Sequence, residues 1–304
     1  MAEEELEKLR REIDSIDVEI QDLLIRRAEI WKEVRDVKGK ASLKLRPGRE
    51  AQIMRNLIAR HHGVFPKPEL IRIWREIFGA ALRVQGPFSA AVFAEGDTLN
   101  NGPTYWDLAR AHFGAYTQMT KFTSARRVIE AVIEDECAIG ILPPPARQEN
   151  DKPDRGSWWR YLAVNNSASG TSGPPRIISR LPFAAPASPG GDKLGALVIA
   201  KSNPEESGDD STYLALDLSK NIAADSVLKI LSTQNLQGNI IAVCHDELAP
   251  ERWIQLVEIT GHLPAKDSRL DNLTGEFDKC LNQWIVLGGY ANPLKPEELL
   301  SDDA

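Results

Sequence analysis

The N-terminal part of the chain shows a regular spacing of apolar and charged positions. Between Leu6 and Lys38 the chain contains neither proline nor glycine, and its apolar side chains recur at steps of three and four residues, the pattern of one amphipathic helix. The apolar positions are Leu6, Leu9, Ile13, Ile16, Ile20, Leu23, Leu24, Ile30, Val34 and Val37. At about 1.5 Å per residue this helix would be roughly 45–50 Å long, more than a small domain is wide. It therefore needs packing partners along its length, which a second subunit would supply.

Two further helices follow. The sequence predicts the second from about Pro47 to His62 and the third from Pro66 to Gln85. Each begins at a proline, which the first helical turn tolerates because its N–H groups have no partner inside the helix. The Gly-Pro pair after the third helix ends it and marks a domain boundary. Residues 1–86 are therefore predicted to form an all-α domain of three helices.

The pattern changes after residue 86. Residues 87–202 contain short apolar runs and helical patterns in the order β-α-(β)-α-β, which predicts an α/β domain. An acidic linker at 203–211 leads into residues 211–291, where the order βαββαβ predicts a ferredoxin-like α+β domain. Its second helix is predicted over 271–283, and residues 292–304 are predicted to form a frayed tail.

Composition and charge limit the classes of function. The 304 residues are 42% apolar and 27% charged, a globular composition with room for two or three domains. A net charge of −7 gives no basic footprint for nucleic acid, so any anion site must be a local cluster of cations. No apolar run is long enough to cross a membrane, and the acidic N-terminus lacks the apolar core of a signal peptide. Three widely spaced cysteines predict reduced thiols in a cytoplasmic protein, and the five histidines show no metal-binding spacing.

The predicted helices carry cations at fixed relative angles. Arg27 and Lys38 are eleven positions apart, so at about 100° per residue they lie within roughly 20° of each other on one helix face. Arg10 is turned roughly 80–100° away from that face. The second and third helices add Arg46, Arg49, Glu50 and Gln85. Together these groups suit a small dianion with a few uncharged polar groups, whereas each of them taken singly is typical of a solvated helix face.

The order and spacing of these charged residues favour a dianion-binding site over a solvated helix face. Four segments, LRREIDSID, LLIRRAEIWKEV followed by VK, RPGREAQI and IWREIFGAALRVQ, resemble in register the all-helical class of chorismate mutases over residues 6–86. The resemblance implies an intertwined homodimer that rearranges chorismate to prephenate in phenylalanine and tyrosine biosynthesis. This Claisen rearrangement is intramolecular and moves no proton, hydride or phosphoryl group, so no cofactor and no metal are implied.

The resemblance also assigns roles to individual residues. Arg27 would hold one carboxylate of the substrate, and the partner subunit's Arg10 would hold the other. Lys38 and Gln85 would flank the ether oxygen, and Glu50 would accept a hydrogen bond from the ring hydroxyl. These groups would act by fixing geometry and by stabilising charge on the ether oxygen.

Three further positions complete the predicted substrate site. Arg49 would support the carboxylate end. Ala81 stands where some relatives carry a serine that touches substrate, and Arg46 takes a position that is acidic in some relatives. Both departures are expected to raise the Michaelis constant without removing an essential group.

The downstream half carries a second resemblance. The segments ARAHFG and VIEAVIEDECAIGILPPP are similar to the first lobe of prephenate dehydratases, and the βαββαβ end is similar to the ACT domain of those enzymes. However, Pro143–Ala146 replace an acid, an amide and a hydroxyl of the dehydratase pattern, and Leu194–Ala196 replace its Thr-Arg-Phe motif. Proton transfer and carboxylate binding need a hydroxyl and a guanidinium there. The sequence therefore predicts a dehydratase-like region that is catalytically silent.

The ACT-like end departs from its family as well. His245–Leu248 do not match the Glu-Ser-Arg-Pro motif near the phenylalanine site, so the C-terminal half is left open to another small-molecule effector or a protein partner. Three alternatives to a mutase remain: a regulatory or scaffolding subunit of a shikimate-pathway enzyme, an isochorismate pyruvate-lyase, and an inactive helical dimerisation hairpin. The intact set of charged residues argues against decay, because unused buried charges are costly.

Overall fold

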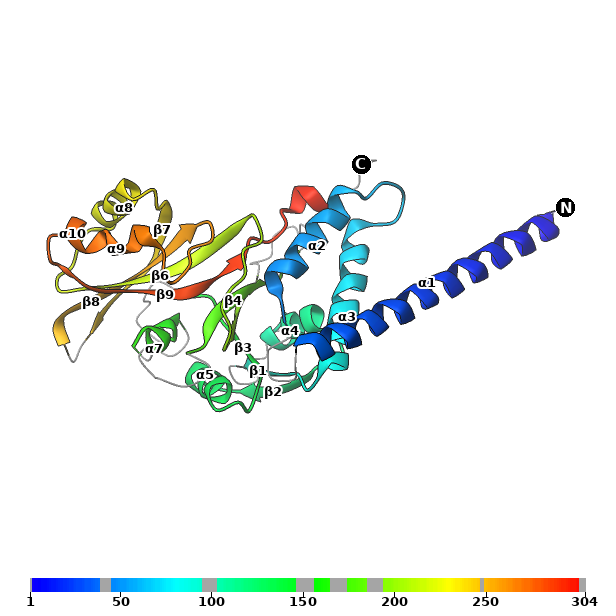
Figure 1. Cartoon of the computed structure of the whole chain (residues 1–304), viewed down its shortest axis with the longest axis horizontal. Helices are drawn as coiled ribbons and strands as arrows, with labels where there is room; N and C mark the ends of the chain where they lie inside the picture. The colour runs from blue at the N-terminus through cyan, green and yellow to red at the C-terminus, as the bar shows by residue number, and fades with distance from the viewer. Residues whose placement is uncertain are drawn as a thin grey trace.

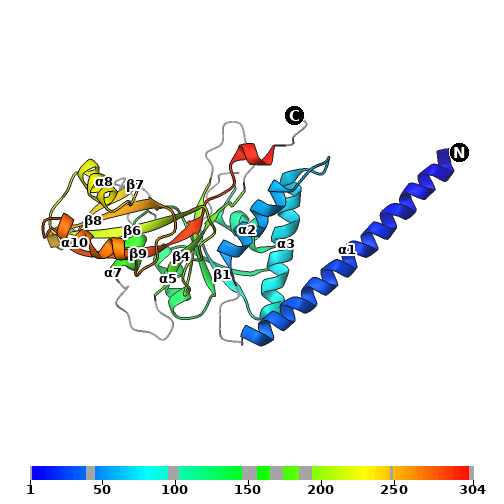
Figure 2. The same ribbon diagram turned by 45° about the horizontal axis from the view of Figure 1, so that its top comes forward.

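The three predicted helices are present, and the first extends away from the others. The computed structural model describes residues 2–38, 45–94, 103–145, 156–164, 174–184, 194–246 and 249–300. Helix α1 (Ala2–Lys38) is a single straight rod that leaves the body of the molecule and meets α3 near its C-terminal end (Figures 1 and 2). Helices α2 (Pro47–Ala59) and α3 (Lys67–Gln85) lie side by side against the body.

Proline and glycine set the ends of α2 and α3. Each helix has a proline in its first turn, and α3 ends at Gly86, whose φ of 149° lies in the left-handed region. The predicted C-terminal end of the third helix, Gln85, is thus confirmed. Helix α2 ends at Ala59 and not at His62, because the chain turns there and Nε2 of His61 donates to the Phe65 carbonyl oxygen at 2.6 Å.

The described residues between 87 and 202 contribute five strands to a sheet. The parallel strands and the helices that connect them are β1 (Ser89–Phe93), α4 (Tyr105–Phe113), β2 (Gln118–Phe122), α5 (Ala125–Ile133) and β3 (Ile139–Leu142). The rest of this part is α7 (Trp159–Val164), β4 (Arg176–Leu181) and β5 (Ala196–Ala200). Strand β5 runs antiparallel to both β3 and β4. The predicted α/β pattern is confirmed, because its apolar runs form buried strands.

The C-terminal part follows the predicted βαββαβ order. Its elements are β6 (Asp210–Leu218), α8 (Ala224–Thr233), β7 (Gly238–Asp246), β8 (Ala249–Thr260), α9 (Ser268–Asp271), α10 (Leu273–Glu276) and β9 (Leu281–Ala291). The strands pair antiparallel in the order β9-β6-β8-β7. The single helix predicted over 271–283 is wrong: this range contains only the last residue of α9, the four-residue helix α10 and the start of β9. A longer helix cannot form because Asp278 and Lys279 adopt φ values of 49° and 62°.

One sheet runs through both parts. Its nine strands have the order β2-β1-β3-β5-β4-β9-β6-β8-β7, and β4 meets β9 where Ile177 pairs with Gly288 (Figure 1). Gly288 has a φ of 120°, and a Cβ at this position would overlap the Ile177 backbone. Only glycine therefore allows the two halves of the sheet to meet here.

Side-chain hydrogen bonds among Arg180, Tyr290 and Glu258 also connect the two halves of the sheet at this junction. Nη1 of Arg180 on β4 donates to the Tyr290 hydroxyl oxygen on β9 at 2.9 Å, and the Tyr290 hydroxyl donates to Oε1 of Glu258 on β8. Burial raises the pKa of Tyr290 to about 12, so the phenol keeps its proton for Glu258. The cluster thus bonds three strands across the junction between the two parts of the sheet.

The helical region is held to the sheet by α2 and by the C-terminal segment. Arg55 donates to the carbonyl oxygens of Ser207, Asp209 and Asn292 at 3.1, 2.8 and 3.0 Å. The prediction of a frayed tail is wrong for residues 292–300. Leu294 and Leu299, the latter on the short helix η2 (Pro296–Leu299), are buried in one cluster with residues of α2 and α3. Apolar burial therefore orders this segment.

Two further findings concern the class of protein. Within the described ranges, no helix combines the length and apolar character that crossing a membrane requires. The cysteines Cys137, Cys244 and Cys280 are all buried and none forms a disulfide. Burial raises the pKa of Cys137 and of Cys244, so both remain thiols at neutral pH.

Candidate functional site

Arg27 lies where α1 meets α3. Its guanidinium carbon is 4.9 Å from the ring centroid of Trp31 and 5.7 Å from that of Phe78. Nη1 of this guanidinium is buried and has no hydrogen-bond partner among the described residues. Partial burial lowers the pKa of Arg27, and a buried donor atom without a hydrogen bond is costly. Nη1 of Arg27 therefore keeps hydrogen-bonding capacity that no described residue of the chain uses.

Glu50 belongs to a more deeply buried cluster that reaches from the helices into the α/β part. Nη1 of Arg75 on α3 donates to Oε2 of Glu50 on α2 at 2.9 Å and to Nε2 of His112 on α4 at 3.2 Å. The side chains of Arg75 and Glu50 are only 6% and 12% exposed. Nη1 carries two hydrogens and can make both bonds at once, provided that His112 is neutral with its proton on Nδ1.

Burial controls the charge of these groups. It raises the pKa of Glu50 to about 7, although the charge and hydrogen bond of Arg75 act to lower it, and the carboxylate of Glu205 adds to the rise. Burial also lowers the pKa of His112 well below its usual value, and the charge of Arg75 acts in the same direction. At neutral pH, Glu50 is therefore divided between its charged and neutral forms while His112 is neutral.

The ring of Phe78 connects Arg27 with this cluster. The guanidinium carbon of Arg75 is 5.9 Å from the Phe78 centroid, on which Arg27 also packs. Ala81 and Gln85 lie three and seven positions after Phe78 on α3, so they share its helix face. Ala81 is buried, and Gln85 is the last residue of the helix and half-buried. The structure thus brings these α3 residues to the side of the helix that faces Arg27.

Other predicted site residues have different partners in the single chain. Nε of Arg46 pairs with Oε1 of Glu205 in the linker at 2.7 Å, and the exposed Arg49 donates to Oε1 of Gln52 at 3.4 Å. Glu205 is also the acid that raises the pKa of Glu50. The linker therefore contacts the start of α2, where the sequence predicted only substrate contacts.

The structure does not place Arg10 or Lys38 beside the other predicted site residues. The exposed Arg10 pairs with Glu7 at 2.6 Å. It lies about 25 Å along α1 from Arg27 at the helical rise per residue. Lys38 is the last residue of α1, and its side chain lies outside the described residues. A single chain therefore does not bring Arg10 to Arg27.

Sequence reasoning missed Arg75 and His112. Arg75 did carry a signal: it interrupts the apolar stripe of Ile71, Phe78 and Leu82 on α3, where a charge needs a buried partner. His112 carried none, because its burial depends on the close packing of α3 against α4. Gly79 permits this approach, since a Cβ there would overlap the Phe113 carbonyl oxygen.

The two stretches that replace the dehydratase motifs meet in space. A Cβ on Gly195 would lie 3.6 Å from Cγ of Pro144. The Pro143 carbonyl oxygen accepts a hydrogen bond from Nε1 of Trp158 at 2.9 Å. Ala146 lies outside the described residues. The side chains described at 143–145 and 194–196 are prolines and aliphatic groups, and they offer no polar atom to a ligand.

Comparison with known proteins agrees with the helical geometry. Residues 9–86 match the family model described as chorismate mutase type II. The helical region is a chorismate mutase domain. A bifunctional chorismate mutase/prephenate dehydratase of Aquifex aeolicus is 32% identical over 145 residues, which cover 46% of this chain and 39% of that protein. The protein of the same description from Pseudomonas aeruginosa is 26% identical over 147 residues, with the same coverage. The chain matches about two fifths of the length of these curated relatives.

Solved structures show a weaker likeness. The prephenate dehydratase from Streptococcus mutans aligns with a TM-score of 0.45 and 12% identity over 68% of this chain and 100% of that chain. A structure described as a novel type of quorum quenching acylase aligns with a TM-score of 0.46 and 15% identity, over 69% of this chain and 96% of that chain. Likenesses at this level do not assign a function to residues 87–300.

Proposed function

We propose that the chorismate mutase domain of this chain converts chorismate to prephenate. The observation that carries the proposal is the half-buried guanidinium of Arg27, which faces α3 and whose buried Nη1 lacks a partner among the described residues. Chorismate is a dicarboxylate, and one of its carboxylates would supply that partner. The reaction needs only a fixed substrate conformation, worth several kcal/mol, and donors at the ether oxygen, worth roughly 3–4 kcal/mol each.

We assign the roles as the sequence predicted them. Arg27 binds one carboxylate and Arg49 supports the carboxylate end from α2, whereas Arg46 pairs with Glu205 and is expected to raise the Michaelis constant. Glu50 accepts the hydrogen bond of the ring hydroxyl while Arg75 holds it in place. Lys38 and Gln85 donate to the ether oxygen, which gains negative charge as the C–O bond breaks. Ala81 leaves room beside Gln85 but offers no hydroxyl to the substrate.

A homodimer would complete the site. Ile13, Ile16, Ile20 and Leu23 keep between 48% and 65% of their surfaces exposed along the projecting part of α1. An apolar face of this length is unfavourable in water and is buried when two copies of α1 pack together. In such a pair Arg10 of the second subunit can reach the site near Arg27, which no residue of the projecting part reaches within one chain.

The dehydratase-like region is proposed to be silent. Pro144 and Gly195 meet where that chemistry would need a hydroxyl and a guanidinium. The chain would then release prephenate as its product. The C-terminal part would serve to bind an effector or a protein partner, or to support the mutase.

The test measures loss of chorismate by the full-length chain, with prephenate and phenylpyruvate quantified separately. We expect prephenate without phenylpyruvate. Lys38→Ala should lower turnover by about a hundredfold or more, because it removes a donor to the ether oxygen, whereas Lys32→Ala on another face of α1 should leave it unchanged. Phenylpyruvate would refute the silent region, and a folded chain without turnover would refute the mutase assignment. Release of pyruvate from isochorismate would favour the lyase alternative.

A further inference from the structure

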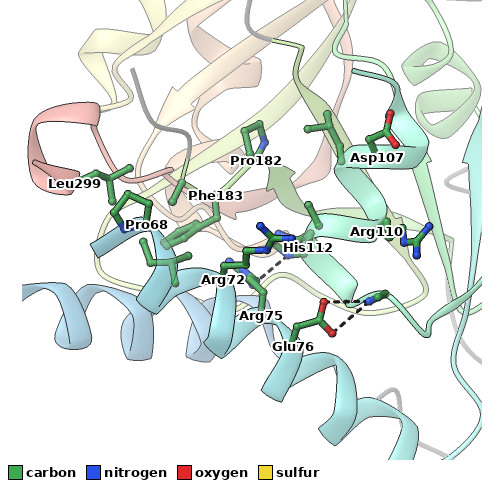
Figure 3. Close-up of a pocket in the computed structure, with 15 residues that line it drawn as sticks. Pro68, Arg72, Arg75, Glu76, Asp107, Arg110, His112, Pro182, Phe183 and Leu299 are labelled. Atoms are coloured by element: carbon green, nitrogen blue, oxygen red, sulfur yellow. Dashed lines mark hydrogen bonds between the residues drawn. The ribbon is translucent and has the colours of Figure 1, made fainter. Parts of the chain in front are cut away.

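A cavity of about 580 Å³ lies between the helical region and the α/β part. Helix α3 forms one wall, α4 forms another, and the segment after β4 closes it together with Leu299 (Figure 3). Small-molecule sites have volumes of roughly 300–1,000 Å³. Neither Arg27 nor Gln85 lines the cavity, and neither Pro144 nor Gly195 does. The cavity therefore lies away from Arg27, Gln85 and the dehydratase positions, but it shares Arg75 with the cluster around Glu50.

One side of the cavity is apolar. Its apolar side chains include Pro68, Ile71, Pro182, Phe183 and Leu299. Phe183 is buried, and its ring centroid lies 5.3 Å from the guanidinium carbon of Arg75. Figure 3 shows Pro68, Phe183 and Leu299 together on one side, next to Arg72, Arg75 and His112. An apolar surface and a cationic surface thus adjoin each other.

The acids of the cavity are already used within the fold. Both carboxylate oxygens of Glu76 accept from the Ala115 N–H, at 3.2 and 3.3 Å. Oδ2 of Asp107 accepts from the backbone N–H and the hydroxyl of Thr104 at 2.9 and 2.7 Å. The exposed guanidinium of Arg72, in contrast, makes no hydrogen bond or ion pair within the described part of the chain. The bonding capacity left in the cavity is therefore cationic.

We propose that this cavity binds a small carboxylate that carries an apolar body of about the size of a phenyl ring. The carboxylate accepts hydrogen bonds from Arg72 and Arg75. Such charge-assisted hydrogen bonds are stronger than those between neutral groups. The apolar body lies against Phe183, Ile71 and Leu299, where its burial drives binding.

The ligand would influence the mutase through Arg75, a part of the proposal that rests on the proposed function. Two charged groups lie near Glu50: Arg75, which comes from α3, and Glu205, which comes from the linker. His112 on α4 accepts the second hydrogen bond of Arg75. A second carboxylate near Arg75 offsets its charge and so raises the pKa of Glu50. The kcat/KM of the mutase would then fall near neutral pH and recover at alkaline pH.

The experiment titrates 3-phenylpropanoate into the full-length chain by isothermal calorimetry. We expect saturable binding that weakens roughly tenfold or more in Arg72→Gln, because one charge-assisted contact is lost. Arg60→Gln, an exposed arginine at the end of α2 outside the cavity, should bind as the wild type does. The alcohol 3-phenylpropan-1-ol tests the carboxylate and acetate tests the apolar body, and both should bind at least about tenfold more weakly.

Several results would overturn the proposal. They are the absence of binding heat, equal affinity for the alcohol or for acetate, and unchanged affinity in Arg72→Gln. Binding that is lost in Arg27→Gln but kept in Arg72→Gln would place the probe in the mutase site and overturn it as well. Calorimetry needs no turnover, so a chain that binds the probe but does not consume chorismate refutes the proposed function alone.

Discussion

Replacing Arg75 with glutamine tests whether Glu50 acts as a carboxylate. Arg75 supplies the charge and the hydrogen bond that lower the pKa of Glu50, against burial and Glu205, which raise it. In Arg75→Gln only the raising causes remain, so the pKa of Glu50 moves above 7. If the carboxylate must accept the ring hydroxyl, kcat/KM of the wild type rises through about pH 7 and then levels off. The plateau persists because Gln85, the proposed ether partner, does not titrate.

The size of the shift follows from the geometry of the pair. An opposite charge in hydrogen-bond contact lowers the pKa of a carboxyl by about 1–3 units, and this contact is 2.9 Å long and largely buried. The acid limb of the variant should therefore lie roughly 1–3 pH units higher. Each unit corresponds to about a tenfold loss of kcat/KM at a fixed pH below the limb. The variant should lose about tenfold or more at neutral pH and regain most of it at alkaline pH.

Stability should change with pH in a matching way. Because the pKa of Glu50 is raised from 4.5 to about 7, the folded chain holds one more proton than the unfolded chain between these values, and stability falls as pH rises. This window corresponds to roughly 3 kcal/mol. His112 has the opposite effect on stability. Because its pKa is lowered in the folded chain, the unfolded chain holds one more proton below pH 6.5, and stability rises with pH there. The wild type should therefore vary little in this range, whereas Arg75→Gln should continue to lose stability above pH 7.

The assay follows chorismate loss and urea unfolding between about pH 5 and 9, the range of the relevant pKa values. Glu50→Gln is the matched control, since a glutamine at this position does not titrate and should flatten the acid limb. The reasoning is refuted if the acid limb of Arg75→Gln coincides with that of the wild type or lies at lower pH.

Three further substitutions test the fold. Ile20→Glu places a charge on the apolar face of α1 and should convert a dimer to monomers in sedimentation while abolishing turnover; a dimer that persists would contradict the packing of α1. Leu299→Ala should lower the free energy of unfolding by about 2–4 kcal/mol, and an unchanged urea midpoint would show that the C-terminal segment is not packed. Gly79→Val should cost about 1–3 kcal/mol or more because its side chain overlaps the Phe113 carbonyl oxygen, whereas Ala80→Val, at a half-buried neighbour, should cost less.

Much of the fold could be predicted because local signals agreed with one another. The period of apolar residues from Leu6 to Val37 defines α1, and the prolines and Gly86 define the limits of α3. The apolar runs that became β1, β3 and β5 are strands buried on both faces, which explains why they lack alternation.

The rest depended on contacts between distant residues. No local pattern indicates that Glu205 reaches Arg46, or that the C-terminal Leu299 packs with α2 and α3. The short α9 and α10 also escape periodicity, because a helix of four residues contains only about one turn. In the site, the type and order of the charged residues were readable, but the partner of Glu50 was not.

The environment of Glu50 joins the two halves of the molecule. Residues 9–86 match the chorismate mutase family model and contain Glu50 and Arg75, but Glu205 and His112 come from outside that range. The carboxylate of Glu205 raises the pKa of Glu50, and His112 shares a buried hydrogen bond with Arg75, the partner of Glu50. The region after residue 86 can therefore influence the mutase whether or not it has dehydratase chemistry, because it supplies the surface against which Arg75 is buried. The pH at which the mutase works would then be a property of the whole chain and not of its three helices alone.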